Sequence, residues 1–270
     1  MNDGAYTEIR YLVDDPVAVL TLDRPSRMNA FTAVTLNEIR HALERSMADQ
    51  RVVGTVITGA GNAFCVGLDA TSLAEAAERP PDASAVRADQ PALFSYIRDL
   101  PKPVIAAVNG MCAGGGFVLA LMCDLRFAAE DAVFTTVFSK RGLVAEHATS
   151  WLLPRLVGSG RALDLLWSSR RVSGAEAVQM GLAERLAEAG HAVQMATAYV
   201  KDLAASASPR SLKITKELVH AHWSASFETA AQEGHDATMR SLGEPDFAEG
   251  VASFLERRVP KFHRLGETSS

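Results

Sequence analysis

Residues 103–124 read PVIAAVNGMCAGGGFVLALMCD, a short apolar segment followed by three consecutive glycines and a second apolar stretch. This order predicts a buried strand, a tight turn at residues 114–116 and a buried helix. The first N–H groups of a helix lack partners within the helix and carry partial positive charge, and glycine lets a ligand approach them closely. The stretch therefore indicates a binding site for an anion or a developing oxyanion, unless the glycines serve only tight packing.

A second glycine-containing turn, AFCVGLD at residues 63–69, follows a strand expected over residues 52–58. Read alone, this turn also fits a helix entry that Asp69 caps with its side chain. Together the two turns indicate a ligand site more strongly than either turn does alone.

Strands are expected in the N-terminal part of the chain at residues 17–22, 52–58, 104–108 and 125–129. Helices alternate with them, including one over residues 36–47 whose apolar positions recur at spacings of three and four. This alternation predicts an α/β architecture. No strand is expected after about residue 196, so we divide the chain into a core, residues 1–195, and a helical region, residues 196–270.

The helical region has two expected helix starts. Ser208 followed by Pro209 is a favourable cap and first turn, and Asp246 with Glu249 three residues later resembles a capping box. The region is too short to bury a good core alone, so we expect it to pack on the core or on a neighbouring subunit. Residues 71–90, rich in Ala, Pro, Asp and Arg, are expected to form a surface segment that could act as a lid.

Composition excludes several classes of protein. Hydrophobic residues make up 48% of the 270 residues and charged residues 22%, with a formal net charge of −5, so neither disorder nor nucleic-acid binding is expected. The three cysteines lack metal-ligand spacing, and His220 and His222 point apart on a helix, so no metal is expected. Residues 117–123 are far shorter than the roughly 20 apolar residues of a membrane span. We expect a cytoplasmic protein.

The two turns carry a resemblance to a known family. AFCVGLD and PVIAAVNGMCAGGGFVLALMCD are similar to the two central motifs of the crotonase superfamily, the enoyl-CoA hydratase/isomerase family. LDRPSRMNA (22–30) and SGAEAVQMGLAERL (173–186) resemble two further segments of that family, and the likeness spans roughly residues 15–260. It implies a spiral of ββα units with C-terminal helices that build a homotrimer or a dimer of trimers.

The resemblance also implies an acyl-CoA thioester as the substrate, with no cofactor beyond the coenzyme A that the substrate carries. The backbone N–H groups of Leu68 and Gly115 correspond to the oxyanion hole, where negative charge gathers as an enolate forms. The remaining positions expected to contact substrate are Arg27, Ala30, Ala63, Cys65, Val66, Gly67, Asp69, Gly114, Phe138, His147 and Trp151. Arg24 or Arg27, and less strongly Arg257, Arg258 or Lys261, are candidates for the CoA phosphates, although each could be a solvated surface charge.

The sequence departs from the family pattern at both usual catalytic glutamates. Val118 and Phe138 stand at those two positions, and neither can move a proton. Glu146 stands where some relatives carry their active aspartate, so it is the candidate acid/base; a role in helix-start electrostatics is the competing explanation. His147 could tune Glu146 or shuttle its proton, but an exposed or packing histidine is the favoured interpretation.

One carboxylate beside an oxyanion hole favours double-bond isomerisation of an enoyl-CoA, with hydration as a further possibility and hydrolysis by Glu146 as nucleophile as another. The rival hypothesis is a non-catalytic acyl-CoA carrier, which the loss of both glutamates favours. A dinucleotide site is disfavoured because GGG lacks the GxGxxG spacing.

Overall fold

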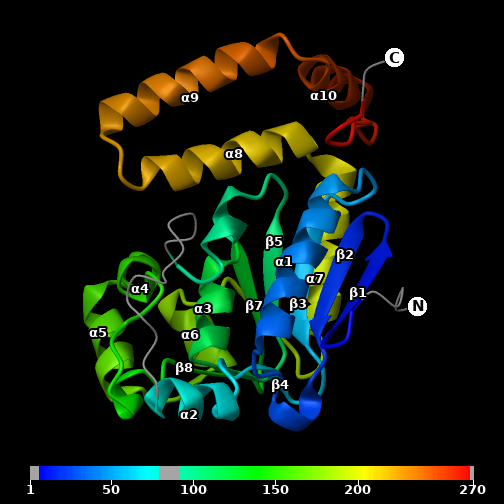
Figure 1. The fold of residues 1–270 in the computed structure, drawn as a ribbon. Coiled ribbons are helices and arrows are strands. Elements are labelled where there is room, and N and C mark those ends of the chain that lie inside the picture. Colours follow the sequence, from blue (N-terminus) through cyan, green and yellow to red (C-terminus); the bar gives the residue numbers. More distant parts are fainter. Residues whose placement is uncertain (1–5, 79–91, 268–270) are drawn as a thin grey trace.

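The computed structural model describes residues 6–78 and 92–267, and its centre is a six-stranded sheet (Figure 1). The strand order is β1-β2-β3-β5-β7-β10, with bounds β1 Ile9–Asp14, β2 Val17–Leu22, β3 Gly54–Gly59, β5 Val104–Val108, β7 Leu125–Ala129 and β10 Arg185–Ala187. β1 pairs antiparallel with β2, and every other pair in this sheet is parallel. The run of apolar residues in β5, buried along its whole length, is typical of a central parallel strand.

A second sheet of four short strands has the order β4-β6-β8-β9. Its strands are β4 Ala63–Cys65, β6 Met111–Ala113, β8 Val133–Thr135 and β9 Val172–Ser173. β3 leads into β4, β5 into β6 and β7 into β8, so each unit places one strand in each sheet. This repetition carries both glycine turns to the same end of the small sheet.

Helices surround the two sheets. They are α1 Ala33–Ala48, α2 Ala70–Glu78, α3 Gly115–Met122, α4 Thr149–Val157, α5 Ser159–Ser168, α6 Gly174–Met180 and α7 Ala192–Ser206, with 3-10 turns at Pro25–Arg27, Ser95–Asp99 and Ser139–Arg141. α1 packs on β1, β2 and β3, whereas α7 lies across β3, β5 and β7. Almost every residue of α3 is buried, as expected for a helix that is apolar on all sides.

The last three helices, α8 Pro209–His222, α9 Phe227–Leu242 and α10 Pro245–Glu256, form an arm at one end of the sheets (Figure 1). An ion pair fastens the arm to the core: the Lys216 ammonium group lies 2.8 Å from Asp124 Oδ2. The same nitrogen donates to the carbonyl oxygens of Ile97 and Lys102. α9 and α10 extend beyond α8 and pack mainly on one another and on α8.

The expected α/β class, the four expected strands and the change to helices after the core are confirmed. Ser208 also caps α8, since its hydroxyl accepts a hydrogen bond from the Ser211 amide. The capping box at Asp246 is wrong: Glu244 is the N-cap of α10 and makes no side-chain cap. Asp246 instead accepts a hydrogen bond from Ser208. Of the expected lid, residues 71–78 belong to α2, and residues 79–90 lie outside the described residues.

Candidate functional site

A cavity of about 130 Å³ lies where the two glycine turns meet. Among the sequence candidates it is lined by Leu68, Gly114, Gly115, Phe138, Glu146 and His147. Its other lining residues are Phe31, Leu36, Leu73, Leu93, Arg141 and Leu143. The structure therefore brings together all three expected catalytic positions, in a cavity whose walls are mostly apolar.

Close backbone contact explains the glycines of this cavity. A Cβ on Gly67 would lie 2.7 Å from the Gly115 nitrogen, and a Cβ on Gly116 would lie 2.2 Å from the Cys65 carbonyl oxygen. Gly67 and Gly114 also have positive φ angles, +91° and +51°, which side chains disfavour. Tight packing therefore requires these glycines, and the same packing places the two turns side by side.

Both candidate amides are left without a partner in the regular structure. Gly115 is the first residue of α3, so its N–H has no acceptor inside the helix. Leu68 forms a parallel bridge with Phe31, in which the Phe31 amide donates to Gly67 and the Asp69 amide donates to Phe31. Since the flanking residues supply those two bonds, the N–H of Leu68 itself faces away from Phe31.

Glu146 and His147 form the polar wall of the cavity. Both side chains are about one-third exposed, and the Glu146 Oε2 to His147 Nε2 distance is 3.9 Å. The other ring nitrogen of His147, Nδ1, accepts a hydrogen bond from the Leu93 amide at 3.2 Å. His147 is therefore held between Glu146 and residue 93, and its φ angle of +52° turns the chain just before α4.

Val118 and Phe138 are apolar and almost completely buried. Phe138 lines the cavity, whereas Val118 lies inside α3 among core residues. The thiols offer no substitute for a carboxylate: burial raises the pKa of Cys65 and Cys112, and raises the pKa of Cys123 to about 12. Protonated, buried thiols are poor nucleophiles.

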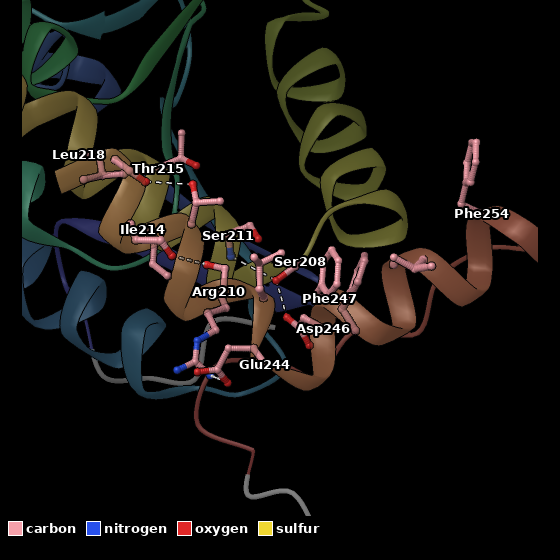
Figure 2. A pocket seen from close by; sticks show the side chains of 18 of the residues that line it. Ser208, Arg210, Ser211, Ile214, Thr215, Leu218, Glu244, Asp246, Phe247 and Phe254 are labelled. Carbon is pink, nitrogen blue, oxygen red and sulfur yellow. Dashed lines mark hydrogen bonds and ion pairs between the residues drawn. The ribbon is translucent and has the colours of Figure 1, made fainter. Parts of the chain in front are cut away.

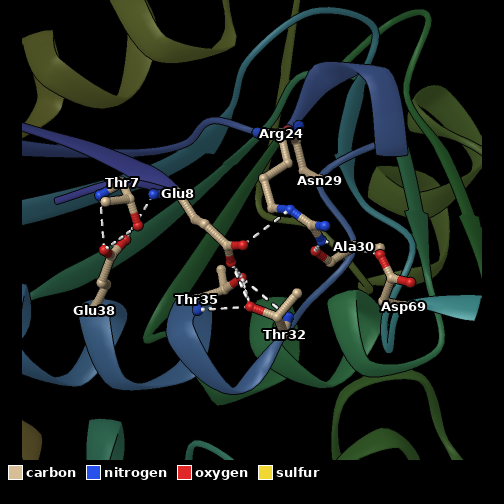
Figure 3. A network of polar contacts seen from close by, with 9 residues as sticks. All are labelled: Thr7, Glu8, Arg24, Asn29, Ala30, Thr32, Thr35, Glu38 and Asp69. Carbon is tan, nitrogen blue, oxygen red and sulfur yellow. Dashed lines mark hydrogen bonds and ion pairs between the residues drawn. The ribbon is translucent and has the colours of Figure 1, made fainter. Parts of the chain in front are cut away.

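A polar network lies behind the Leu68 turn (Figure 3). Arg24 Nη1 donates to the carbonyl oxygen of Ala30 at 2.6 Å and to Asp69 Oδ2 at 3.1 Å. Arg24 Nε lies 3.3 Å from Glu8 Oε1. The Thr71 amide and Arg24 lower the pKa of Asp69. The guanidinium is thus paired inside the protein, and Asp69 begins α2 as a cap instead of facing the cavity.

The remaining expected binding positions are spread around the site. The Ala63 carbonyl accepts a hydrogen bond from the Asn29 side chain, and the Cys65 sulfur accepts one from the Gly67 amide. Arg27 lies exposed in the 3-10 turn. Trp151 is absent from the cavity lining; it packs on Trp223, with ring centroids 5.0 Å apart.

Arg258, a candidate for contacting phosphate, is paired with carboxylates of the protein. Arg258 pairs with Glu249 at 2.6 Å and with Glu256 at 2.6 Å. The bond from Arg258 to Glu249, with one from the Lys261 amide, lowers the pKa of Glu249 to about 2. These contacts join the end of α10 to the segment that follows it.

A second cavity, of about 310 Å³, adjoins the first. Val66, Ala113, Lys140, Arg141 and Arg171 are among its lining residues, and Arg141 lines both cavities. Within the described residues no carboxylate pairs with these three cations. They were not predicted, because Lys140 and Arg141 in one segment and Arg171 in another form no motif.

A larger hollow, of about 860 Å³, lies within the arm between α8, α9 and α10 (Figure 2). It is lined by apolar residues such as Ile214, Leu218 and Phe247, and by polar residues at one end, where Ser208 meets Asp246. Phe254 and Leu255 are 81% and 73% exposed. No cluster of metal-ligating side chains occurs in residues 6–78 and 92–267, and no helix there has the length and hydropathy to cross a membrane.

Comparisons with known proteins agree with this architecture. The family model described as enoyl-CoA hydratase/isomerase matches residues 13–265. The chain is 36% identical over 260 residues to a probable enoyl-CoA hydratase of Rhodobacter capsulatus, covering 96% of this chain and 98% of that protein. It is 31% identical to the 1,2-epoxyphenylacetyl-CoA isomerase of Escherichia coli, covering 93% and 96%. An enoyl-CoA hydratase structure from Polaromonas superposes with a TM-score of 0.88 at 32% identity, covering 94% and 99%.

Proposed function

Because this chain belongs to the enoyl-CoA hydratase/isomerase family, and is an enzyme of that family, we propose that it moves the double bond of an enoyl-CoA thioester. The observation that carries this proposal is one carboxylate, Glu146, in the same cavity as the two open amides of Leu68 and Gly115. A single acid/base is sufficient for a proton shift between two carbons.

The amides of Leu68 and Gly115 would bind the thioester oxygen. Removal of a proton from the carbon next to the thioester places negative charge on that oxygen. Preorganised donors stabilise such charge strongly in a site closed to water, and loss of one donor typically costs about 10²–10³ in rate. The backbone contact between Gly67 and Gly115 supports this role, since it holds the two donors side by side.

Glu146 would perform both proton transfers. Its carboxylate takes the proton from C2 of a 3-enoyl thioester, the electrons spread over C2 to C4 and the thioester oxygen, and a proton that Glu146 has exchanged with solvent returns at C4. The double bond then lies between C2 and C3, and no water is added. The apolar side chains of Phe138 and Leu143 in the cavity wall favour this outcome over hydration, which needs a positioned water.

The CoA part of the substrate would run from the 130 Å³ cavity into the neighbouring 310 Å³ cavity, which we call the basic cavity. Val66 and Ala113, which line the basic cavity, stand two residues before Leu68 and Gly115 on the same two segments. A CoA chain that leaves the thioester along these two segments meets Lys140, Arg141 and Arg171. For the variant Lys140→Met/Arg171→Met we expect KM to rise about tenfold with kcat unchanged, since phosphate contacts made equally in both states affect binding alone.

Self-association, as a homotrimer or dimer of trimers, completes the proposal. The exposed Phe254 and Leu255 beside the hollow of the arm support a second copy of the chain as its occupant. A cytoplasmic location stays a prediction, as does the division at residue 195.

The proposal is tested by incubating the protein with a panel of saturated and unsaturated acyl-CoAs in D₂O, with Glu146→Gln in parallel. Mass spectrometry separates deuterium gain, water addition and free acid. We expect deuterium gain without water addition, reduced about 10²–10⁴-fold in the variant. Water addition would favour hydration, and free acid would favour Glu146 as a nucleophile. Tight binding of acyl-CoA without any exchange would instead identify a carrier.

A further inference from the structure

The network behind the Leu68 turn contains a cation in an unusual place. The guanidinium group of Arg24 is about four-fifths buried and has carboxylates on two sides, Glu8 at 3.3 Å and Asp69 at 3.1 Å. The surroundings favour the ionised form of both carboxyl groups. The Thr71 amide and Arg24 lower the pKa of Asp69. Burial opposes ionisation of Glu8, but the hydroxyl groups of Thr32 and Thr35 and the charge of Arg24 outweigh it and lower its pKa.

One nitrogen of Arg24 joins the two chain segments that form the Leu68 bridge. Nη1 bonds to the carbonyl of Ala30, the residue before Phe31, and to the side chain of Asp69, the residue after Leu68. Phe31 and Leu68 are themselves the two residues of the bridge. The bonds of the guanidinium to Ala30 and Asp69 (Figure 3), with the Asp69 amide bonded to the Phe31 carbonyl, close a ring directly beside Leu68.

The far side of Arg24 is also anchored. Its own backbone amide donates to the side-chain oxygen of Asn29 at 2.9 Å, and the Asn29 nitrogen donates to the carbonyls of Ala60 and Ala63. Glu8 accepts hydrogen bonds from Thr32 and Thr35 at the start of α1. These bonds connect Arg24 to the start of α1 and to the β3–β4 connection.

We infer that Arg24 is a positioning residue that fixes the direction of the Leu68 amide through its shared bonds to Ala30 and Asp69. This inference rests on the proposed oxyanion site. It replaces the expectation that Arg24 reaches the CoA phosphates, because Nε and Nη1 of the guanidinium already pair with Glu8, Ala30 and Asp69. Two amides hold an oxyanion only when both point at it, and displacements of about 1 Å can cost on the order of 100-fold in rate.

The variants Arg24→Met and Arg24→Lys test the inference. The first removes the bridge, and the second keeps the charge but replaces the planar fork with a point donor. For Arg24→Met we expect kcat to fall about 10- to 100-fold with KM changed less than about threefold, because ground-state contacts with CoA are not removed. Asp69→Asn, which weakens the same bridge from the other end, is expected to lower kcat in the same direction.

A spectroscopic measurement separates positioning from general loss of structure. Cinnamoyl-CoA bound to the Glu146→Gln protein reports carbonyl polarisation through a red shift of its absorption band. We expect Arg24→Met in this background to bind the probe and to lose most of the shift. Arg10→Gln is the matched control, since Arg10 pairs with Asp23 at 2.9 Å on the surface beside Arg24 and touches neither side of the bridge.

The outcomes are distinguishable. A full red shift and unchanged kcat in folded Arg24→Met and Asp69→Asn proteins would overturn the inference and leave the oxyanion proposal intact. A raised KM with unchanged kcat would also overturn it, since that pattern belongs to a CoA contact. If the parent Glu146→Gln protein binds the probe without any shift, the oxyanion proposal fails, and the positioning role fails with it.

Discussion

The core of this protein buries its apolar side chains, whereas the arm leaves several of them exposed. In the core, the exposed fractions of Ile105 and Phe117 are at most 1%, and backbone packs on backbone at the glycine turns. In the arm, Phe254 and Leu255 remain more than 70% exposed beside a hollow of about 860 Å³. The core therefore completes its own packing, whereas the arm presents a surface that a second molecule would complete.

The small cavity of the core and the large hollow of the arm differ in a second respect. The 130 Å³ cavity has Glu146 and two open amides in its wall, whereas the polar groups of the hollow are already paired, as Ser208 is with Asp246 and Arg210 with Glu244. The volume of a cavity therefore does not decide which one is the candidate active site. The criterion used is the presence of open hydrogen-bond donors beside an acidic side chain.

The largest expected effect comes from disturbing the packing of the core. Gly116→Ala places a Cβ 2.2 Å from the carbonyl oxygen of Cys65, so one backbone must move. We expect the free energy of unfolding to fall by about 3 kcal/mol, measured by chemical denaturation.

Gly160→Ala is the matched control, because a Cβ there meets no atom within 4 Å and lies within α5. It should be neutral or stabilising, by less than about 1 kcal/mol. Equal destabilisation by both variants would mean that close packing at the turn is not what fixes its geometry.

An intermediate effect is expected from the arm. Phe254→Asp puts a charge on the rim of the hollow, and we expect the molar mass in solution to fall towards that of one chain, measured by light scattering after gel filtration. Phe227→Asp is the control, since Phe227 is equally exposed but does not line the hollow. An unchanged assembly in Phe254→Asp would show that this face is not the contact between subunits.

The smallest expected effect concerns pH and the end of α10. Bonds from Arg258 lower the pKa of Glu249 to about 2, below its ordinary value near 4.5. Its stabilising contribution is therefore present above pH 4.5 and is lost as the pH falls towards 2. The protection factors of the amides in residues 245–261, which are exchange rates corrected for the pH dependence of free amides, should fall over this range in the wild type and change less in Glu249→Gln. The same pH response in both proteins would refute the role of Glu249.

The sequence predicted the class of fold well because its strongest signals are local. The apolar runs at residues 17–22, 104–108 and 125–129 became β2, β5 and β7 with the expected bounds. The two- and three-residue strands of the small sheet were missed, because so short a segment shows no period. Asp246 was misplaced because a local spacing could not reveal the hydroxyl of Ser208, which reaches it from another helix.

The candidate site was predicted in part for the same reason. Leu68, Gly115 and Glu146 were predicted from the resemblance of their segments to family motifs, and they line one cavity. Trp151 packs on Trp223 and does not line the cavity, a contact that the sequence could not reveal because the two residues lie 72 positions apart. The pairing of Arg24 with Glu8 and Asp69 was not predicted, since neither carboxylate could be placed beside it from the sequence.

The most direct test of a single-carboxylate isomerase is the fate of one substrate, 3-hexenoyl-CoA, in D₂O followed by NMR. The account predicts that the double bond moves to C2–C3 with deuterium at C4, that no 3-hydroxyacyl-CoA forms, and that Glu146→Gln abolishes the change. Formation of the 3-hydroxyacyl product without double-bond migration, or migration that persists in Glu146→Gln, would contradict it.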